Sequence, residues 1–254
     1  MRLILYNMQY ASGLNGSLYN YFKIWKHIKA PQNIIKNIAY ELKTFAPDFL
    51  ALVEIDSGSP RAKKQSQIKF LQDKLNLNYN ANHLKYSEQD LRKLHKIPYF
   101  KHQENAFLSN TQIIETKFYF FSCGTKRLVI ESKISVENKE LTFIIVHLSL
   151  THKNRQKQFI ELSKIIENIK TPLIVAGDFN NFKGELEFTA FAKKTNLNIA
   201  HSSANEFKTY PSHNPKKHLD HVFYSNDISI KKYKVIPNLK YSDHLPILVD
   251  FVLK

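Results

Sequence analysis

Residues 172–182 read PLIVAGDFNNF, an apolar run that ends at Gly177 and is followed at once by Asp178 and Asn180. The run before the glycine is suited to a buried strand. Residues two apart on an extended chain point the same way, so this carboxylate and this carboxamide are expected to face one space. Taken alone, the stretch favours an Asx turn, in which Asp or Asn bonds nearby backbone. The rest of the chain changes that interpretation.

Apolar, strand-like runs and a few helical patterns occupy the chain on both sides of this stretch. Several runs are continuously apolar, as strands are when a helix covers one face and a second sheet covers the other. The sequence therefore predicts one α/β domain over residues 1–254, with two sheets packed together and helices flanking them. Strands are expected at residues 2–9, 48–55, 105–109, 117–121, 127–134, 141–148, 172–176, 219–224, 228–235 and 247–252, and helices after Pro31, near 68–75, at 152–170 and at 185–194.

Composition limits the class of protein. With 254 residues and a hydrophobic fraction of 43%, the chain can bury a sizeable core. The single Cys123 excludes an internal disulfide and a multi-cysteine zinc site, and it indicates a reducing compartment. No apolar run approaches the roughly 18–20 residues of a membrane span, and the start, MRLILYNMQY, lacks a signal-peptide cleavage pattern. A cytoplasmic location is expected, with export by a route that uses no N-terminal signal left open.

The charge balance indicates the class of partner. Lys and Arg total 37 against 22 Asp and Glu, a formal net charge of +15. This excess favours a polyanion, either nucleic acid or an anionic membrane lipid; a compositional bias toward Lys, Asn and Ile is the alternative explanation. No obligate protein partner is evident. The chain has six glycines and no P-loop, G-x-G-x-x-G, H-E-x-x-H or G-x-S-x-G motif, which disfavours nucleotide-binding loops, zincins and serine hydrolases.

Polar residues stand where six otherwise apolar stretches end. Unpaired charge in such a run is costly, so one such residue is usually a structural ion pair or a cap. Six of them together are better explained by one functional site. They are Asn7 in the first strand, Glu54 in LVEI, His147 in IIVHLS, Asp178 and Asn180 in VAGDFN, Asp220 in HLDHVFY, and Asp243 with His244 in YSDHLPILVDF.

The motifs GDFN (177–180), LDHVF (219–223) and SDHLP (242–246) together resemble the endonuclease/exonuclease/phosphatase family of metal-dependent phosphoesterases, which includes deoxyribonuclease I. The resemblance runs from Asn7 to His244 with the motifs in family order. It implies a four-layered α-β-β-α sandwich, with two mixed sheets packed face to face and flanked by helices. It also implies hydrolysis of phosphate esters.

The same resemblance implies a metal site. Glu54 is similar to the principal metal carboxylate of the family, Asn7 to an amide at the edge of the metal, and Asp243 to an acid that ligates or orients metal-bound water. Oxygen ligands without cysteine suit Mg²⁺ or Mn²⁺ better than zinc. Whether one ion or two would act is left open.

The resemblance further assigns catalytic roles. Asp178 resembles the residue that orients and deprotonates the attacking water, with Asn180 holding that water or a phosphate oxygen. His244 is similar to the imidazole that contacts the scissile phosphate, and Asp220 to the carboxylate that holds its ring. His147 is similar to a second phosphate-facing histidine, the alternative being a satisfied core histidine.

Three residues near these motifs receive other interpretations. His218 and His221 flank Asp220 and are expected to be non-catalytic; strand parity directs the adjacent His221 away from it. Arg127, in KRLVIES, stands where relatives often have a basic residue near the site, although a solvated charge explains it nearly as well.

Substrate choice within the family depends on local features. Lys153 and Arg155 after the fourth motif, with Lys216 and Lys217 before LDHVF, are expected to contact phosphates along a nucleic-acid backbone. The aromatic and basic stretch 10–30 fits base stacking, contact with an anionic bilayer, or a loop that buries Trp25.

A nuclease that uses in-line attack of an Asp178-activated water is therefore the favoured function. A phospholipid-directed phosphoesterase, of sphingomyelinase or phosphoinositide phosphatase type, is the alternative. A non-catalytic polyanion-binding scaffold is disfavoured because Glu54, Asp178 and His244 are all present. DNA versus RNA, endo versus exo cleavage and oligomeric state stay open.

Overall fold

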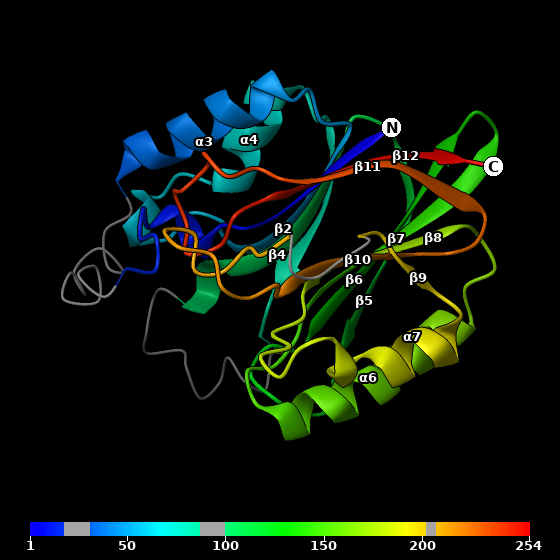
Figure 1. Ribbon diagram of the computed structural model, residues 1–254. Helices are drawn as coiled ribbons and strands as arrows, with labels where there is room; N and C mark the ends of the chain where they lie inside the picture. Colours follow the sequence, from blue (N-terminus) through cyan, green and yellow to red (C-terminus); the bar gives the residue numbers. More distant parts are fainter. Residues whose placement is uncertain (18–30, 87–99, 202–206) are drawn as a thin grey trace.

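The computed structural model describes residues 1–17, 31–86, 100–201 and 207–254, and these residues form two six-stranded sheets packed face to face (Figure 1). The first sheet has the order β11 (Ile228–Val235), β12 (Ile247–Leu253), β1 (Arg2–Asn7), β2 (Phe49–Asp56), β4 (Gln103–Ser109) and β3 (Tyr79–Leu84). The second has the order β5 (Ile113–Phe120), β6 (Leu128–Val136), β7 (Lys139–His147), β8 (Leu173–Asp178), β10 (Asp220–Tyr224) and β9 (Asn198–Ile199).

Helices cover the outer face of each sheet. Helices α3 (Gln32–Thr44) and α4 (Gln67–Leu75) lie on the first sheet, and α6 (His152–Glu167) and α7 (Thr189–Thr195) lie on the second (Figure 1). Short 3-10 turns complete the connections at Gln9–Ala11, Pro60–Ala62, Phe100–His102 and Glu185–Glu187. The predicted four-layered sandwich of mixed sheets and flanking helices is confirmed.

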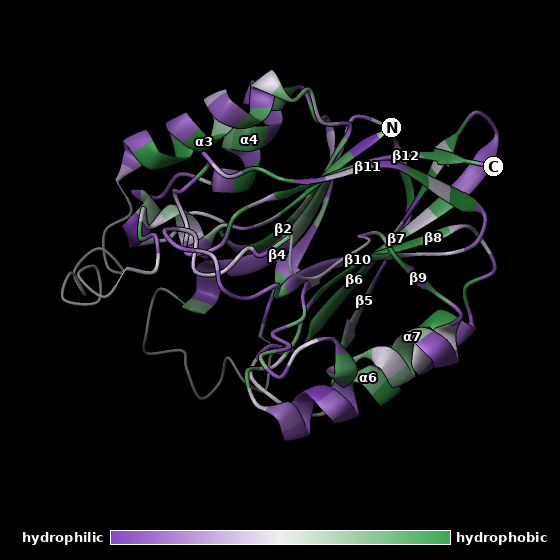
Figure 2. Ribbon diagram, viewed as in Figure 1, coloured by the Kyte–Doolittle hydropathy of each residue, from purple (hydrophilic) through white to green (hydrophobic). Residues whose placement is uncertain are grey.

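The alternation of side chains explains why the strands are continuously apolar. On β1, Leu3 and Leu5 pack between the two sheets, whereas Ile4 and Tyr6 pack beneath α3 and α4. Both faces of a central strand are therefore buried, as the sequence pattern indicates. Figure 2 shows hydrophobic residues along the strands, and helices α3 and α6 that carry both hydrophobic and hydrophilic residues.

The parallel pairing of β7 with β8 positions the Gly177 motif. Val146 lies opposite Gly177 and His147 lies opposite Asp178. A Cβ atom at residue 177 would lie 2.0 Å from the Val146 carbonyl oxygen, so only glycine fits this register. On the other side, β10 runs antiparallel to β8 and places Asp220 opposite Asp178. The ends of three neighbouring strands thus bring their polar residues together.

The structure differs from the sequence prediction in a few elements. The expected helix at 185–194 is a 3-10 turn, Glu185–Glu187, followed by α7, which begins at Thr189. Strand β3 was not predicted, because it is a largely polar edge strand in which only Ala81 is buried. Most of the stretch 10–30, including Trp25, lies outside the described residues. None of the helices in the described ranges is both long enough and apolar enough to cross a membrane.

Candidate active site

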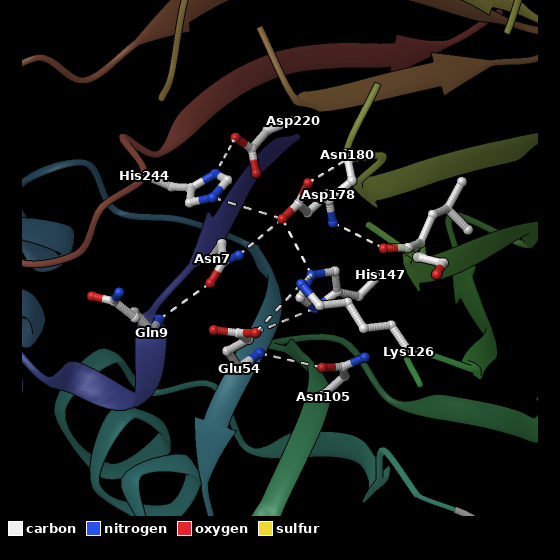
Figure 3. A network of polar contacts seen from close by, with 12 residues as sticks. Asn7, Gln9, Glu54, Asn105, Lys126, His147, Asp178, Asn180, Asp220 and His244 are labelled. Carbon is white, nitrogen blue, oxygen red and sulfur yellow. Dashed lines mark hydrogen bonds and ion pairs between the residues drawn. The ribbon is translucent and has the colours of Figure 1, made fainter. Parts of the chain in front are cut away.

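The carboxylate of Asp178 is the centre of a buried polar network at the ends of β1, β7, β8 and β10 (Figure 3). Its Oδ2 accepts a hydrogen bond from Asn7 Nδ2 at 3.0 Å and lies 3.2 Å from His147 Nε2 and 3.7 Å from His244 Nε2. Its Oδ1 accepts the backbone N–H of Asn180 at 3.0 Å. The Asx turn and the shared site are therefore both present at GDFN.

His244 is held by a carboxylate on its far side. Its Nδ1 lies 2.7 Å from Asp220 Oδ2, which also accepts the hydroxyl of Thr209 at 2.5 Å. Burial acts to lower the pKa of His244, but Asp220 and Asp178 outweigh it and raise that pKa to about 10. The ring is therefore a buried imidazolium with Nε2 directed at Asp178. Thr209 was not identified from the sequence, since it stands in a polar stretch without periodicity.

Glu54 reaches the site through an irregularity in β2. The register with β4 shifts between Leu52 and Ile55, and Glu54 adopts the left-handed conformation with φ of 55°. Such a backbone costs on the order of 1–2 kcal/mol for a residue with a side chain. The backbone N–H of Glu54 donates to Asn105 Oδ1 at 3.2 Å, which supports the bulge. Bulges re-aim side chains, and here a carboxylate is directed toward the polar network (Figure 3).

Two lysines that the sequence prediction missed lie beside Glu54. Nζ of Lys126 is 3.6 Å and Nζ of Lys85 is 3.7 Å from Glu54 Oε1. Burial acts to raise the pKa of Glu54, but Lys126, Lys85 and His147 lower it to about 2, so the carboxylate is ionised. Lys126 also contacts Nε2 of His147, whose pKa is lowered to about 4 by burial and by this lysine.

The oxygen donors fit a divalent cation. Glu54 supplies a carboxylate, Asn7 an amide oxygen and Asp243 a second carboxylate. Burial raises the pKa of Asp243 to about 6, and the charges of Glu54 and Asp178 act in the same direction. The negative charges of these three acids therefore act against one another, and a cation among them would offset that repulsion. An all-oxygen set of this kind suits Mg²⁺ or Mn²⁺.

A different set of donors lies close enough together to hold an ion, but its chemistry differs from that of the oxygen donors. Asp178, Asp220 and His244 each place one donor atom within 4.8 Å of the others. His244 is protonated and already bonded to Asp220, and an imidazolium nitrogen has no lone pair to offer a metal. We interpret this set as a hydrogen-bonded relay.

The structure corrects the expectation for Arg155. The residue is 1% exposed, and its Nη2 lies 2.5 Å from Glu187 Oε2. Its Nη1 donates to the carbonyl oxygens of Ser149 at 3.0 Å and Leu150 at 2.6 Å. The guanidinium therefore fixes the loop after β7, so the predicted phosphate contact is wrong.

The remaining basic residues predicted to bind substrate lie in different settings. Arg127 is half-buried and its Nε donates to the carbonyl of Phe121, while the neighbouring Lys126 occupies the site. Lys216 and Lys217 are exposed and line a pocket of about 220 Å³. Lys153 is exposed in the first turn of α6. Substrate contact by these four residues stays a prediction.

Comparisons with known proteins agree with this architecture. A family model described as "Endonuclease/Exonuclease/phosphatase family" matches residues 32–244. A UPF0294 protein of Vibrio campbellii is 31% identical over 129 residues, a match that covers 48% of this chain and 44% of that protein.

Solved structures share the fold at low sequence identity. The human nocturnin catalytic domain with a bound sulfate anion has a TM-score of 0.71 at 19% identity, over 100% of this chain and 93% of that chain. A mannosyl-6-phosphatase of Bacteroides thetaiotaomicron has a TM-score of 0.71 at 15% identity, over 100% of both chains. At such identities the likeness shows a common fold.

Proposed function

This chain belongs to the endonuclease/exonuclease/phosphatase family of hydrolases, and we propose that it is a metal-dependent phosphoesterase that cleaves phosphodiester bonds in nucleic acid. The observation that carries the proposal is the position of Asp178, whose carboxylate lies between Asn7, His147 and His244. A carboxylate held among hydrogen-bond donors and cationic groups can orient a water molecule for attack on phosphorus.

Asp178 is suited to orienting the attacking water. Burial acts to raise its pKa, but His244 and His147 outweigh it and hold that pKa below the usual range. The carboxylate is therefore ionised at neutral pH and can accept a hydrogen bond from a water molecule, which would orient that water for attack. Asn180 donates its Nδ2 to the carbonyl of Leu148 at 2.9 Å, which fixes the carboxamide beside Asp178. Its oxygen is then oriented to hold the same water.

Positively charged side chains in the site would stabilise the negatively charged phosphorane. His244 carries a proton, and Asp220 with Thr209 holds its ring in place. Lys126 adds a second positive charge near His147. Glu54, Asn7 and Asp243 would hold the divalent ion, which when bound neutralises phosphate charge and supports departure of the leaving oxygen.

Nucleic acid is the substrate class that the charge distribution favours. The net charge of +15 attracts polyanions. Four lysines, Lys183, Lys208, Lys216 and Lys217, line one pocket, together with the exposed ring of Phe182. Lysines with an aromatic ring suit a phosphodiester backbone and an unpaired base.

A hydrolysis panel tests the proposal. The purified chain, with Mg²⁺ or Mn²⁺, is offered plasmid DNA, single-stranded RNA, sphingomyelin vesicles and a phosphoinositide, and Asp178→Asn serves as the blank. Cleavage of a nucleic acid alone is the expected result. Cleavage of a lipid alone would replace the proposed substrate class. Nucleic-acid binding without turnover on any substrate would indicate a polyanion-binding scaffold.

A further inference from the structure

A second cluster of metal-ligating side chains lies next to the active site and takes no part in the chemistry described above. His201 follows β9, and His218 and His221 stand on either side of Asp220 at the start of β10. Each ring offers one nitrogen, and the three nitrogens lie within 4.8 Å of one another. His221 is fully buried, His218 is 7% exposed, and the side chain of His201 is 3% exposed.

The ring nitrogens of this cluster divide into two kinds. His221 Nε2 lies 2.9 Å from Asn181 Oδ1 and 3.2 Å from the His218 carbonyl, and His218 Nε2 lies 3.1 Å from the Tyr233 hydroxyl. The Nδ1 atoms of both rings, and both nitrogens of His201, are buried without a hydrogen-bond partner among the described residues. An unsatisfied buried polar group costs about 1–3 kcal/mol, so four such atoms in one place require an explanation.

We propose that His201, His218 and His221 form a second metal site, for a late first-row divalent ion such as Zn²⁺. A ligating histidine characteristically gives its other ring nitrogen to a protein partner, as His218 and His221 do here. Nitrogen donors favour zinc and its neighbours over Mg²⁺. This site is therefore chemically distinct from the oxygen donors around Glu54.

The protonation state of the rings suits this role. Burial lowers the pKa of His201 to about 4 and that of His218 to about 3, and it holds the pKa of His221 well below its ordinary value. Burial therefore favours the neutral imidazole, which is the form that binds a metal. Glu185 stands at the edge of the cluster as a fourth ligand. Its Oε1 lies 3.4 Å from His201 Nε2 and has no hydrogen-bond partner within the described part of the chain.

Only small movements would be needed to bind the ion. With Zn–N distances of about 2.0–2.1 Å in a tetrahedral site, ligand nitrogens are about 3.4 Å apart. The rings would have to close by at most about 1.4 Å, given their present limit of 4.8 Å. Tilted and edge-on ring contacts with Phe207 and Tyr233 contribute to the burial of the cluster. They do not account for nitrogens that lack partners.

A metal here would stabilise the segment that carries the active-site relay. His218 and His221 bracket Asp220, the carboxylate that holds His244. An ion bound to both histidines would link this turn to the end of β9 and to the segment after β8 that carries Asn181 and Glu185. The proposal does not depend on which phosphate ester is cleaved.

Cobalt titration of the whole chain tests the site, because tetrahedral Co²⁺ has a characteristic visible absorption. Metal-free protein in excess Mg²⁺, which occupies the oxygen site, is titrated with Co²⁺ and then with Zn²⁺. One equivalent of tetrahedral Co²⁺ that Zn²⁺ displaces is expected. His201→Gln and His218→Gln should each weaken binding by more than about 100-fold, whereas the exposed His213→Gln and the oxygen-site variant Glu54→Gln should retain it.

Because the cluster histidines are also packed side chains, a measurement on the unaltered chain accompanies the variants. X-ray absorption of the zinc-loaded protein should show three imidazole ligands. No binding by the unaltered chain, an oxygen-only coordination shell, or undiminished binding by folded His201→Gln and His218→Gln would each overturn the proposal.

Discussion

Asp220 and His244 are 24 residues apart in the chain and lie 2.7 Å apart, Oδ2 to Nδ1, at the edge of the candidate active site. The carboxylate keeps the imidazole protonated and turns its other nitrogen toward Asp178, at 3.7 Å. This pairing connects the LDHVF and SDHLP motifs physically. This contact explains why the two motifs occur together in the sequence.

Replacing Asp220 by Asn should impair turnover more than substrate binding. The amide cannot supply the negative charge that holds a proton on His244, so the cationic contact to the phosphate is lost at neutral pH. We expect kcat to fall by about 10²–10⁴-fold, the usual contribution of a positioned acid or base, with a smaller change in KM. Steady-state kinetics measures both, and Asp227→Asn in the turn between β10 and β11 is the control. An unchanged kcat would remove Asp220 from the mechanism.

Divalent metal should stabilise the folded chain as well as activate it. If Glu54, Asn7 and Asp243 hold the ion, Mg²⁺ at a hundredfold excess over its Kd adds about 2.7 kcal/mol to the free energy of unfolding. Denaturant titration with Mg²⁺ and with EDTA measures this increment. Glu54→Gln should lose most of this increment, while Glu41→Gln at a half-buried position on α3, outside the site, should retain it. Full hydrolytic activity in excess chelator would exclude the metal assignment.

The Arg155–Glu187 pair should make stability depend on pH below the neutral range. Burial acts to raise the pKa of Glu187, but His152, the backbone N–H of Lys183 and Arg155 lower it. The pKa of Glu187 is thus lower in the folded chain than its ordinary value of 4.5. The ionised carboxylate therefore stabilises the fold fully above pH 4.5, and this stabilisation is lost as the pH falls through the folded-state pKa. Glu187→Gln should therefore lower the free energy of unfolding by about 3–5 kcal/mol at pH 7, because the charge of Arg155 is left buried without a counter-ion.

The difference between the unaltered chain and Glu187→Gln should then shrink below about pH 4.5, when the native carboxylate also loses its charge. Denaturant titration from pH 7 to pH 3 follows it. The exposed Lys194–Glu167 pair provides a matched comparison, since Glu167→Gln should change stability by less than about 1 kcal/mol at any pH. A pH-independent cost for Glu187→Gln would assign the effect to packing.

The charged residues show where sequence reasoning reaches its limit. Asp178 is the last residue of β8 and Asp220 is the first residue of its antiparallel partner β10, so the pairing of these two strands could predict that they meet. His244 stands in the loop before β12 of the other sheet, and strand pairing alone does not place it. Lys85 and Lys126 stand in polar stretches, and only the bulge at Glu54 brings that carboxylate beside them. No periodicity in the sequence encodes that irregularity.

Arg155 was assigned to the site from the sequence, but the structure places it elsewhere. Basic residues beside a catalytic motif suggest phosphate contacts, but its partner Glu187 lies 32 residues further along the chain. Helical spacing alone gives the face on which Arg155 lies. It cannot tell whether that face meets solvent or a buried carboxylate, since this depends on how the segment after β8 folds back over α6.

Reversing the charge of Lys216 and Lys217 should weaken nucleic-acid binding in a salt-dependent way. Each phosphate contact to single-stranded nucleic acid contributes a slope of about 0.7 in the logarithm of affinity against the logarithm of salt. We therefore expect Lys216→Glu with Lys217→Glu to reduce the slope by about 1.4, measured by fluorescence anisotropy on single-stranded RNA with Asp178→Asn to prevent cleavage. The control, Lys193→Glu with Lys194→Glu on α7, changes net charge equally. Identical slopes for both double variants would mean that total charge, and not the pocket, binds the strand.

Gly177→Ala tests whether the motif glycine is required by strand pairing. Its Cβ would lie 2.0 Å from the Val146 carbonyl oxygen, so β7 and β8 would have to separate where His147 and Asp178 face each other. We expect the free energy of unfolding to fall by about 3 kcal/mol, at the upper end of overpacking substitutions. Turnover should also fall, even in the fraction that folds. Gly184→Ala separates clash from backbone strain, because a Cβ there meets open space at φ of 90° and should cost only about 1–2 kcal/mol. If thermal denaturation gave both variants the same loss, the close approach of the two strands would not be what selects glycine at 177.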